Sequence, residues 1–171
     1  GSTVATNTIL EKKGAKVGML TTEGFRDSLE IRRGIRDNQW DHRAPFPEVL
    51  VPRYLRLPVR GRIGADGQEF APLDAEDVDA AAKFFATEGV ESVAVCLFNS
   101  FLNGTHERDT GAQLARVWPG KWVSLSSDVM PTMGEYERGS TAVVNAYIAP
   151  KVTSYLHALD KQLRQLGLPR S

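Results

Sequence analysis

The segment from 133 to 147 carries more charged and hydroxyl side chains than a helix needs for packing alone. Glu135, Glu137 and Arg138 fall within one helical turn, and Asn145 lies about two turns after Glu137 on the same polar ridge. Carboxylates can act as general acids or bases, and an arginine can hold carboxylate or phosphate oxygens. The segment therefore predicts a functional helix, although an amphipathic helix with ordinary surface charges fits the same pattern.

A second polar group follows the most apolar strand pattern of the chain, which runs from 90 to 98. Asn99 and Ser100 come directly after it, and His106 and Glu107 lie a few residues further on. In open α/β sheets, ligands bind beyond the carboxyl ends of the strands, so these side chains are candidates for a site. Alternatively, His106 and Glu107 simply form a helix N-terminus with an acid near the helix dipole.

The elements that would position these groups alternate between helix and strand, which predicts an α/β fold. Asp74 is the predicted N-cap of a helix that ends at Gly89, and Thr105 is the predicted cap of the next one. Pro58 places its strand at a sheet edge. Before these helices we expect a helix over 2–14, a strand over 16–21, a short helix before 31 and a hairpin around 65–67. The two helices themselves should run over 74–89 and 105–117. After them we expect a strand over 122–125 with a turn at 126–128, the helix after 133, and an amphipathic helix after a kink or break at 149–150.

A long irregular excursion is expected over about 32–58, where arginines such as Arg32 and Arg36 alternate with aromatic residues such as Trp40. Acidic residues dilute its charge and prolines interrupt it, so single-stranded nucleic acid is not an expected ligand. Long connections of this kind usually have a function, so we interpret it as a functional or interface loop.

Composition sets the general class of the protein. The 171 residues are 42% hydrophobic and 25% charged, with 21 basic and 21 acidic side chains, which indicates a globular chain without a bias toward nucleic acid or acidic membranes. Cys96 lies in an apolar run and should be a buried packing residue in a cytoplasmic protein. No apolar run is long enough to span a bilayer, and the three histidines share no metal-ligand spacing.

Several separated motifs together resemble the family of hydantoinase A, 5-oxoprolinase and the acetone and acetophenone carboxylases. They occur in order along nearly the whole chain, at 2–14, 22–27, 93–100 with 106–107, 135–138 and 141–147. The resemblance implies an actin-like or sugar-kinase-like ATPase fold, with a mixed sheet and flanking helices. It also implies an enzyme that uses ATP and Mg²⁺ to phosphorylate a carbonyl oxygen, working with a hydantoinase B-type partner subunit on a cyclic amide or a ketone.

The resemblance also suggests roles for particular residues. The expected catalytic residues are His106, Glu135, Glu137 and Arg138. The expected contacts to substrate or nucleotide are Thr3, Thr6, Asn7, Arg32, Arg36, Asn99, Ser100 and Asn145. No metal-ligating residue is expected in this chain.

The sequence departs from the family pattern in its phosphate-binding loops. The Asp-x-Gly-Gly-Thr loop with which the family opens does not occur, and neither do the later glycine-rich motifs. We therefore expect an interior piece of a larger subunit, with an α/β module over 1–148 and a C-terminal helix over 149–171 that leads into a following domain. Such a piece should not hydrolyse ATP alone.

Two other interpretations stay open. The chain could be a non-catalytic module that docks a partner subunit through the excursion at 32–58. It could also be an independent small enzyme that uses His106 with Glu107 or Glu135 as acid and base. Neither the substrate nor the choice between hydrolysis and carboxylation follows from the sequence.

Overall fold

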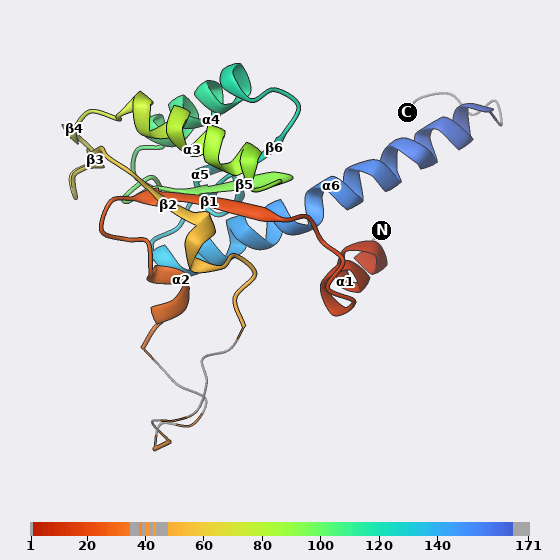
Figure 1. Cartoon of the computed structure of the whole chain (residues 1–171), viewed down its shortest axis with the longest axis horizontal. Helices are drawn as coiled ribbons and strands as arrows, with labels where there is room; N and C mark the ends of the chain where they lie inside the picture. The colour runs from red at the N-terminus through yellow and green to blue at the C-terminus, as the bar shows by residue number, and fades with distance from the viewer. Residues whose placement is uncertain (1, 35–37, 39, 42, 44–47, 166–171) are drawn as a thin grey trace.

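A parallel sheet of four strands forms the centre of the molecule (Figure 1). The computed structural model describes residues 2–34, 38, 40, 41, 43 and 48–165. The strands lie in the order β2-β1-β5-β6, with bounds β1 Val17–Thr22, β2 Arg56–Val59, β5 Ser92–Cys96 and β6 Trp122–Leu125. A separate antiparallel pair, β3 (Arg62–Ile63) with β4 (Glu69–Ala71), forms the hairpin expected around 65–67. The predicted α/β class is confirmed, with its parallel and antiparallel pairings in two separate sheets.

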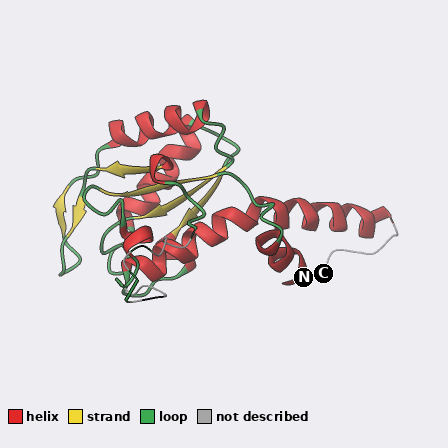
Figure 2. Ribbon diagram, turned by 60° about the horizontal axis from the view of Figure 1, so that its bottom comes forward, coloured by secondary structure: helices red, strands yellow, loops and turns green. Residues whose placement is uncertain are grey.

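Helices cover both faces of the parallel sheet (Figures 1 and 2). One face is covered by α3 (Ala75–Thr87) and α4 (Thr105–Val117), and the long helix α6 (Glu135–Gln165) crosses the other. The remaining helical segments are α1 (Ser2–Leu10), α2 (Ser28–Ile31), the short 3₁₀ turn η1 (Arg53–Leu55) and α5 (Ser126–Val129). Because the strands run parallel, the polar residues that follow β5 and β6 meet at one edge of the sheet.

The core forms where strand β5 is buried on both faces, as its apolar sequence predicts. On the α3 side, Phe85 packs directly on Gly18 of β1, where an added Cβ would lie 2.7 Å from the ring. On the α6 side, a Cβ at Gly139 would lie 3.2 Å from Met19. The helices therefore approach the sheet closely because small residues stand at both contacts.

The N-terminus of α3 is capped as the sequence predicts. The Asp74 side chain accepts hydrogen bonds from the backbone N–H groups of Glu76 and Asp77. Asp77 in turn accepts two hydrogen bonds from the Arg60 guanidinium, at 2.8 and 2.7 Å. Pro58 lies in β2, which is an edge strand as expected.

The Arg60–Asp77 pair gives a prediction about acid stability. The hydrogen bond from the Arg60 side chain holds the pKa of Asp77 below its usual 3.8. The pair therefore stabilises the folded state above that usual value, and this contribution is lost as the pH falls through the lowered folded pKa. Asp77→Asn should lower the free energy of unfolding by about 1 kcal/mol or less at neutral pH.

Urea denaturation of the wild type and of Asp77→Asn, at neutral pH and at about pH 2, tests how the stability difference between them changes with pH. The difference should shrink in acid, while Glu76→Gln, which removes an exposed carboxylate from the same turn, should show a smaller difference at neutral pH. A difference for Asp77→Asn that grows toward acid would contradict the assignment.

Several predicted element ends differ in the structure. α1 ends at Leu10 rather than near Gly14, which instead packs against the Tyr147 ring so closely that a Cβ would lie 2.2 Å from it. Thr105 is the first residue of α4 rather than its cap, because Asn103 Oδ1 accepts from both its N–H and its hydroxyl. The turn expected at 126–128 is part of the short helix α5.

A kink or break was expected at 149–150, and helix α6 continues through Pro150 without a break. Beyond Ala149 the helix extends away from the body of the molecule (Figure 1), and none of its described residues is buried. Four large side chains on this part are 36 to 52% exposed: Tyr155, Leu156, Leu159 and Leu163. The expected division into a 1–148 module and a C-terminal helix stays a prediction. None of the described helices has an apolar stretch long enough to cross a bilayer.

Cys96 is buried at the end of β5, as the sequence predicts. Burial raises the pKa of the Cys96 thiol to about 12. At about pH 8 the folded chain should therefore react with a disulfide reagent roughly 100-fold or more slowly than the chain unfolded in urea. A stopped-flow measurement of thiol release checks this, and equal rates in the two states would show that the thiol is accessible.

Candidate functional site

A buried arginine lies at the carboxyl ends of β5 and β6. The Arg138 side chain is 0% exposed and makes contacts with several elements. Its Nη2 donates to the Leu97 carbonyl at 2.9 Å and to Glu135 Oε1 at 2.6 Å. Its Nη1 donates to the hydroxyls of Ser100 and Ser126. The guanidinium therefore joins the start of α6 to the segments that follow both strands.

Glu107 is the second charge in this network and is also 0% exposed. Its carboxylate accepts hydrogen bonds from the Ser100 and Ser126 hydroxyls, at 2.8 and 2.6 Å, and from the backbone N–H groups of Leu97 and Ser127. Its Oε1 lies 3.8 Å from Arg138 Nη1. Both buried charges are thus paired and hydrogen-bonded, so the network should hold the start of α6 rigidly against the segments that follow β5 and β6.

The four residues expected to be catalytic do not converge. Glu135 and Arg138 meet in the network, but His106 Nε2 lies 3.4 Å from Glu69 Oε1 on β4. Glu137 pairs with Arg33, and a backbone hydrogen bond together with this arginine lowers the pKa of Glu137. The structure does not bring His106 together with either proposed partner of an independent small enzyme. His106 contacts Glu69, whereas Glu107 is hydrogen-bonded to Ser100 and Ser126 and Glu135 to Arg138.

The residues expected to contact substrate or nucleotide are also divided. Ser100 belongs to the buried network, and Asn99, at φ 57°, donates to the Ile63 carbonyl. Asn145 Nδ2 donates to the Ser124 hydroxyl at 3.0 Å.

The other members of this set lie elsewhere. Thr3, Thr6 and Asn7 lie on α1, which packs against α6 away from α2 (Figure 1). Arg36 falls outside the described residues.

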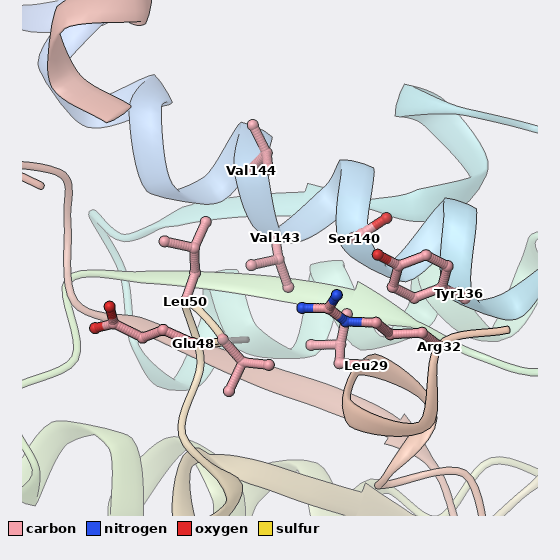
Figure 3. A pocket seen from close by; sticks show the side chains of 9 residues that line it. Leu29, Arg32, Glu48, Leu50, Tyr136, Ser140, Val143 and Val144 are labelled. Atoms are coloured by element: carbon pink, nitrogen blue, oxygen red, sulfur yellow. The ribbon is translucent and has the colours of Figure 1, made fainter. Parts of the chain in front are cut away.

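Arg32, another member of this set, lines a pocket (Figure 3). The pocket has a volume of about 170 Å³ and lies between α2, the segment 48–50 and the first turns of α6. Its lining residues are Leu29, Arg32, Glu48, Val49, Leu50, Tyr136, Ser140, Val143 and Val144. Most of these are apolar or carry a hydroxyl, and pockets of this composition bind small molecules.

Arg32 reaches the pocket through an unusual backbone conformation. Its φ of 56° and ψ of −130° lie in a region that residues other than glycine rarely adopt. Such a conformation costs about 1–3 kcal/mol and is concentrated at functional sites. The Arg32 side chain extends toward the α6 face that carries Tyr136, Ser140 and Val143 (Figure 3).

The charge of Arg32 is not neutralised within the described part of the chain. No described side chain forms an ion pair or hydrogen bond with its guanidinium. Glu48, the acidic lining residue, points away from it in Figure 3 and pairs with Lys12. The neighbouring Arg33 is paired with Glu137 instead. The pocket therefore presents a free cation beside an apolar wall.

Tyr136 and Ser140 are pocket residues that the sequence did not single out as binding groups. They lie four residues apart, so both face the pocket from one side of α6. Ser140 donates to the Glu137 carbonyl at 3.1 Å and keeps an oxygen lone pair available. The spacing of Tyr136, Ser140 and Val144 was the only signal for this face, and it is equally typical of core packing.

A parallel sheet with helices on both faces defines a doubly wound α/β module, a class in which many functions occur. Comparison of the sequence with family models narrows this class. Residues 1–117 match the model described as the hydantoinase/oxoprolinase N-terminal region. The chain therefore belongs to the hydantoinase/oxoprolinase family.

Individual relatives match over nearly the whole chain. The caprolactamase alpha subunit of Pseudomonas jessenii is 41% identical over 98% of the chain and 24% of the relative. The crystal structure of the ATP-dependent caprolactamase from this organism superposes with a TM-score of 0.89 over 98% of the chain and 25% of that structure. The acetophenone carboxylase gamma subunit of Aromatoleum aromaticum is 33% identical over 97% of the chain and 24% of its own length. The chain thus spans about a quarter of the relatives it matches.

Proposed function

We propose that this chain is part of an ATP-dependent subunit that activates a carbonyl oxygen by phosphorylation. The activated carbonyl would belong either to a cyclic amide that is hydrolysed or to a ketone that is carboxylated. The observation that carries the proposal is the match of 98% of the chain to the ATP-dependent caprolactamase, in sequence and in fold. Carboxylation is the alternative because the acetophenone carboxylase subunit matches over a similar length.

ATP and Mg²⁺ would be held by parts of the enzyme outside this chain. The turn after β1 contains Glu23 and Asp27, and Asp27 is already paired with Arg53, so neither side chain offers a positive charge to phosphate groups. Phe25 of that turn stacks on Phe98 after β5, with ring centroids 4.4 Å apart, and Arg62 lies over both rings. The described residues therefore do not fit a triphosphate between β1 and β5, where nucleotides bind in related α/β folds.

The function of this chain would then be to bind substrate and to position other parts of the enzyme. The Arg138–Glu107 network would hold the start of α6 in register with the sheet, so that Tyr136 and Ser140 face Arg32 across the pocket. His106, Glu135, Glu137 and Arg138 stay proposed catalytic residues, and we expect a partner of the hydantoinase B type in the cytoplasm.

The deciding measurement is release of phosphate from ATP by the intact parent enzyme with its partner subunits. Hydantoin, 5-oxoproline and caprolactam should be compared with acetone and acetophenone, the two ketones with and without bicarbonate. Stimulation by a cyclic amide supports hydrolysis, and stimulation by a ketone that depends on bicarbonate supports carboxylation. The 171-residue chain alone, as a control, should release no phosphate.

Failure of all five compounds to stimulate, in enzyme shown to bind ATP, would contradict the proposal. The interaction-module alternative would then lead, because Trp40 is 90% exposed within the excursion and Tyr155 and Leu156 are exposed on α6. Trp40→Ala should in that case release a co-purified partner, as native mass measurement of the assembly would detect.

A further inference from the structure

We infer that the pocket between α2 and α6 binds a small organic carboxylate with a compact apolar body. Two features of the pocket point to this ligand class. Arg32 offers an unpaired planar cation, and its fork geometry matches the two oxygens of a carboxylate. Leu29, Val143 and Val144 provide an apolar surface beside it.

The hydroxyls complete the recognition of the charged group. The Tyr136 hydroxyl has no hydrogen-bond partner among the described residues, and in Figure 3 it points to the same part of the pocket as the Ser140 hydroxyl. Tyr136 can donate to a carboxylate oxygen that Arg32 already holds. A neutral ligand would leave the Arg32 charge without a partner, so the pocket should discriminate in favour of an anion.

The size of the pocket limits the ligand. Its volume of about 170 Å³ is below the roughly 300–1,000 Å³ of sites for drug-sized molecules. The pocket can therefore enclose only a small part of a nucleotide, and inorganic phosphate would leave the apolar wall unused. A ring or short chain of a few carbons with one carboxylate uses both parts of the site.

If the proposed function is correct, both candidate reactions form a product of this ligand class. Cleavage of a cyclic amide by water leaves a carboxylate and an amine. Joining a carboxyl carbon to the carbon next to a ketone also leaves a carboxylate. The pocket would accordingly hold the carboxylate end of the product of either reaction.

Binding to the 171-residue chain tests the inference without ATP. Isothermal titration calorimetry should detect cyclopentanecarboxylate, while the neutral cyclopentanecarboxamide and inorganic phosphate should bind at least about tenfold more weakly. Equal binding of the carboxamide would overturn the role of the charge. Equal binding of phosphate would overturn the role of the apolar wall, and no binding of the carboxylate would overturn the site.

Paired variants assign the binding to this pocket. Arg32→Ala should weaken cyclopentanecarboxylate by about tenfold or more, whereas Arg33→Ala, which removes the adjacent and already paired arginine, should not. Ser140→Leu should abolish binding by filling the pocket. Unchanged affinity in Arg32→Ala would place the ligand elsewhere and overturn the inference.

Arg32→Gly separates loss of binding from loss of folding. Glycine accepts a φ of 56° without strain, so this variant should melt at or above the temperature of the wild type while losing the carboxylate. Retained binding in Arg32→Gly would overturn the inference. If the carboxylate binds as predicted but no substrate stimulates the ATPase of the parent enzyme, only the proposed function is overturned. If a substrate stimulates the ATPase but the carboxylate does not bind, only this inference is overturned.

Discussion

Arg138→Met is expected to lower the free energy of unfolding of this chain by about 3–5 kcal/mol. The substitution removes the only full positive charge within the buried network and leaves Glu107, which is 0% exposed, without its ionic partner. It also leaves the Leu97 carbonyl without the Arg138 hydrogen bond at 2.9 Å. The loss is a large fraction of the 5–15 kcal/mol that stabilises an ordinary domain.

Urea denaturation followed by circular dichroism measures this effect. Arg33→Met is the matched control, because the Arg33 side chain is 70% exposed and an exposed ion pair such as the one with Glu137 contributes little to stability. Adding Glu107→Gln to Arg138→Met should recover part of the loss, since the unpaired buried charge is removed. If Arg138→Met and Arg33→Met were equally stable, the buried network would not stabilise the folded state as inferred.

Phe85→Ala is expected to have a comparable effect, a loss of about 3–5 kcal/mol in the free energy of unfolding. Phe85 is 0% exposed and its ring fills the space above Gly18, while the Trp118 ring lies 6.4 Å away. The cavity cannot be filled from β1, because Gly18 has no side chain. Truncation therefore removes apolar contacts on both sides of the ring.

Phe84→Ala is the internal control for this prediction, because it makes the same chemical change at the next residue. Phe84 is 38% exposed, so its truncation removes less buried apolar area and should cost less than half as much stability as Phe85→Ala. Thermal and urea denaturation of the two variants in parallel provide the comparison. A larger loss for Phe84→Ala would mean that α3 is rotated relative to the sheet.

Features that depend on neighbouring residues could be predicted from the sequence. The cap at Asp74 needs only the N–H groups of the following turn, and the apolar run of β5 indicates a central strand by itself. Pro58 excludes a central position because it cannot donate in a sheet. Of the kink or break expected at Pro150, the structure excludes the break, since a long helix can tolerate one missing hydrogen bond where its other turns continue.

The candidate site was only partly predictable. The sequence identified Arg138, Ser100 and Glu135 as important, and these three do meet in the structure. It did not distinguish a buried network from a site open to ligand, because exposure depends on the packing of α6 against the sheet. Fully buried Arg138 and partly exposed Tyr136 lie only two residues apart on the same helix.

By itself, the sequence determined the α/β class, the edge and central strands and the family motifs, because local propensity, hydrophobic period and short motifs lie within single segments. Only the tertiary structure decided that Arg138 is enclosed by Glu107 and that Arg32 faces Tyr136 across a pocket. Arg32 and Tyr136 come from elements about one hundred residues apart, and their meeting depends on where α2 and α6 lie on the sheet. Contacts of this kind arise from the packing of whole elements, which no local pattern encodes.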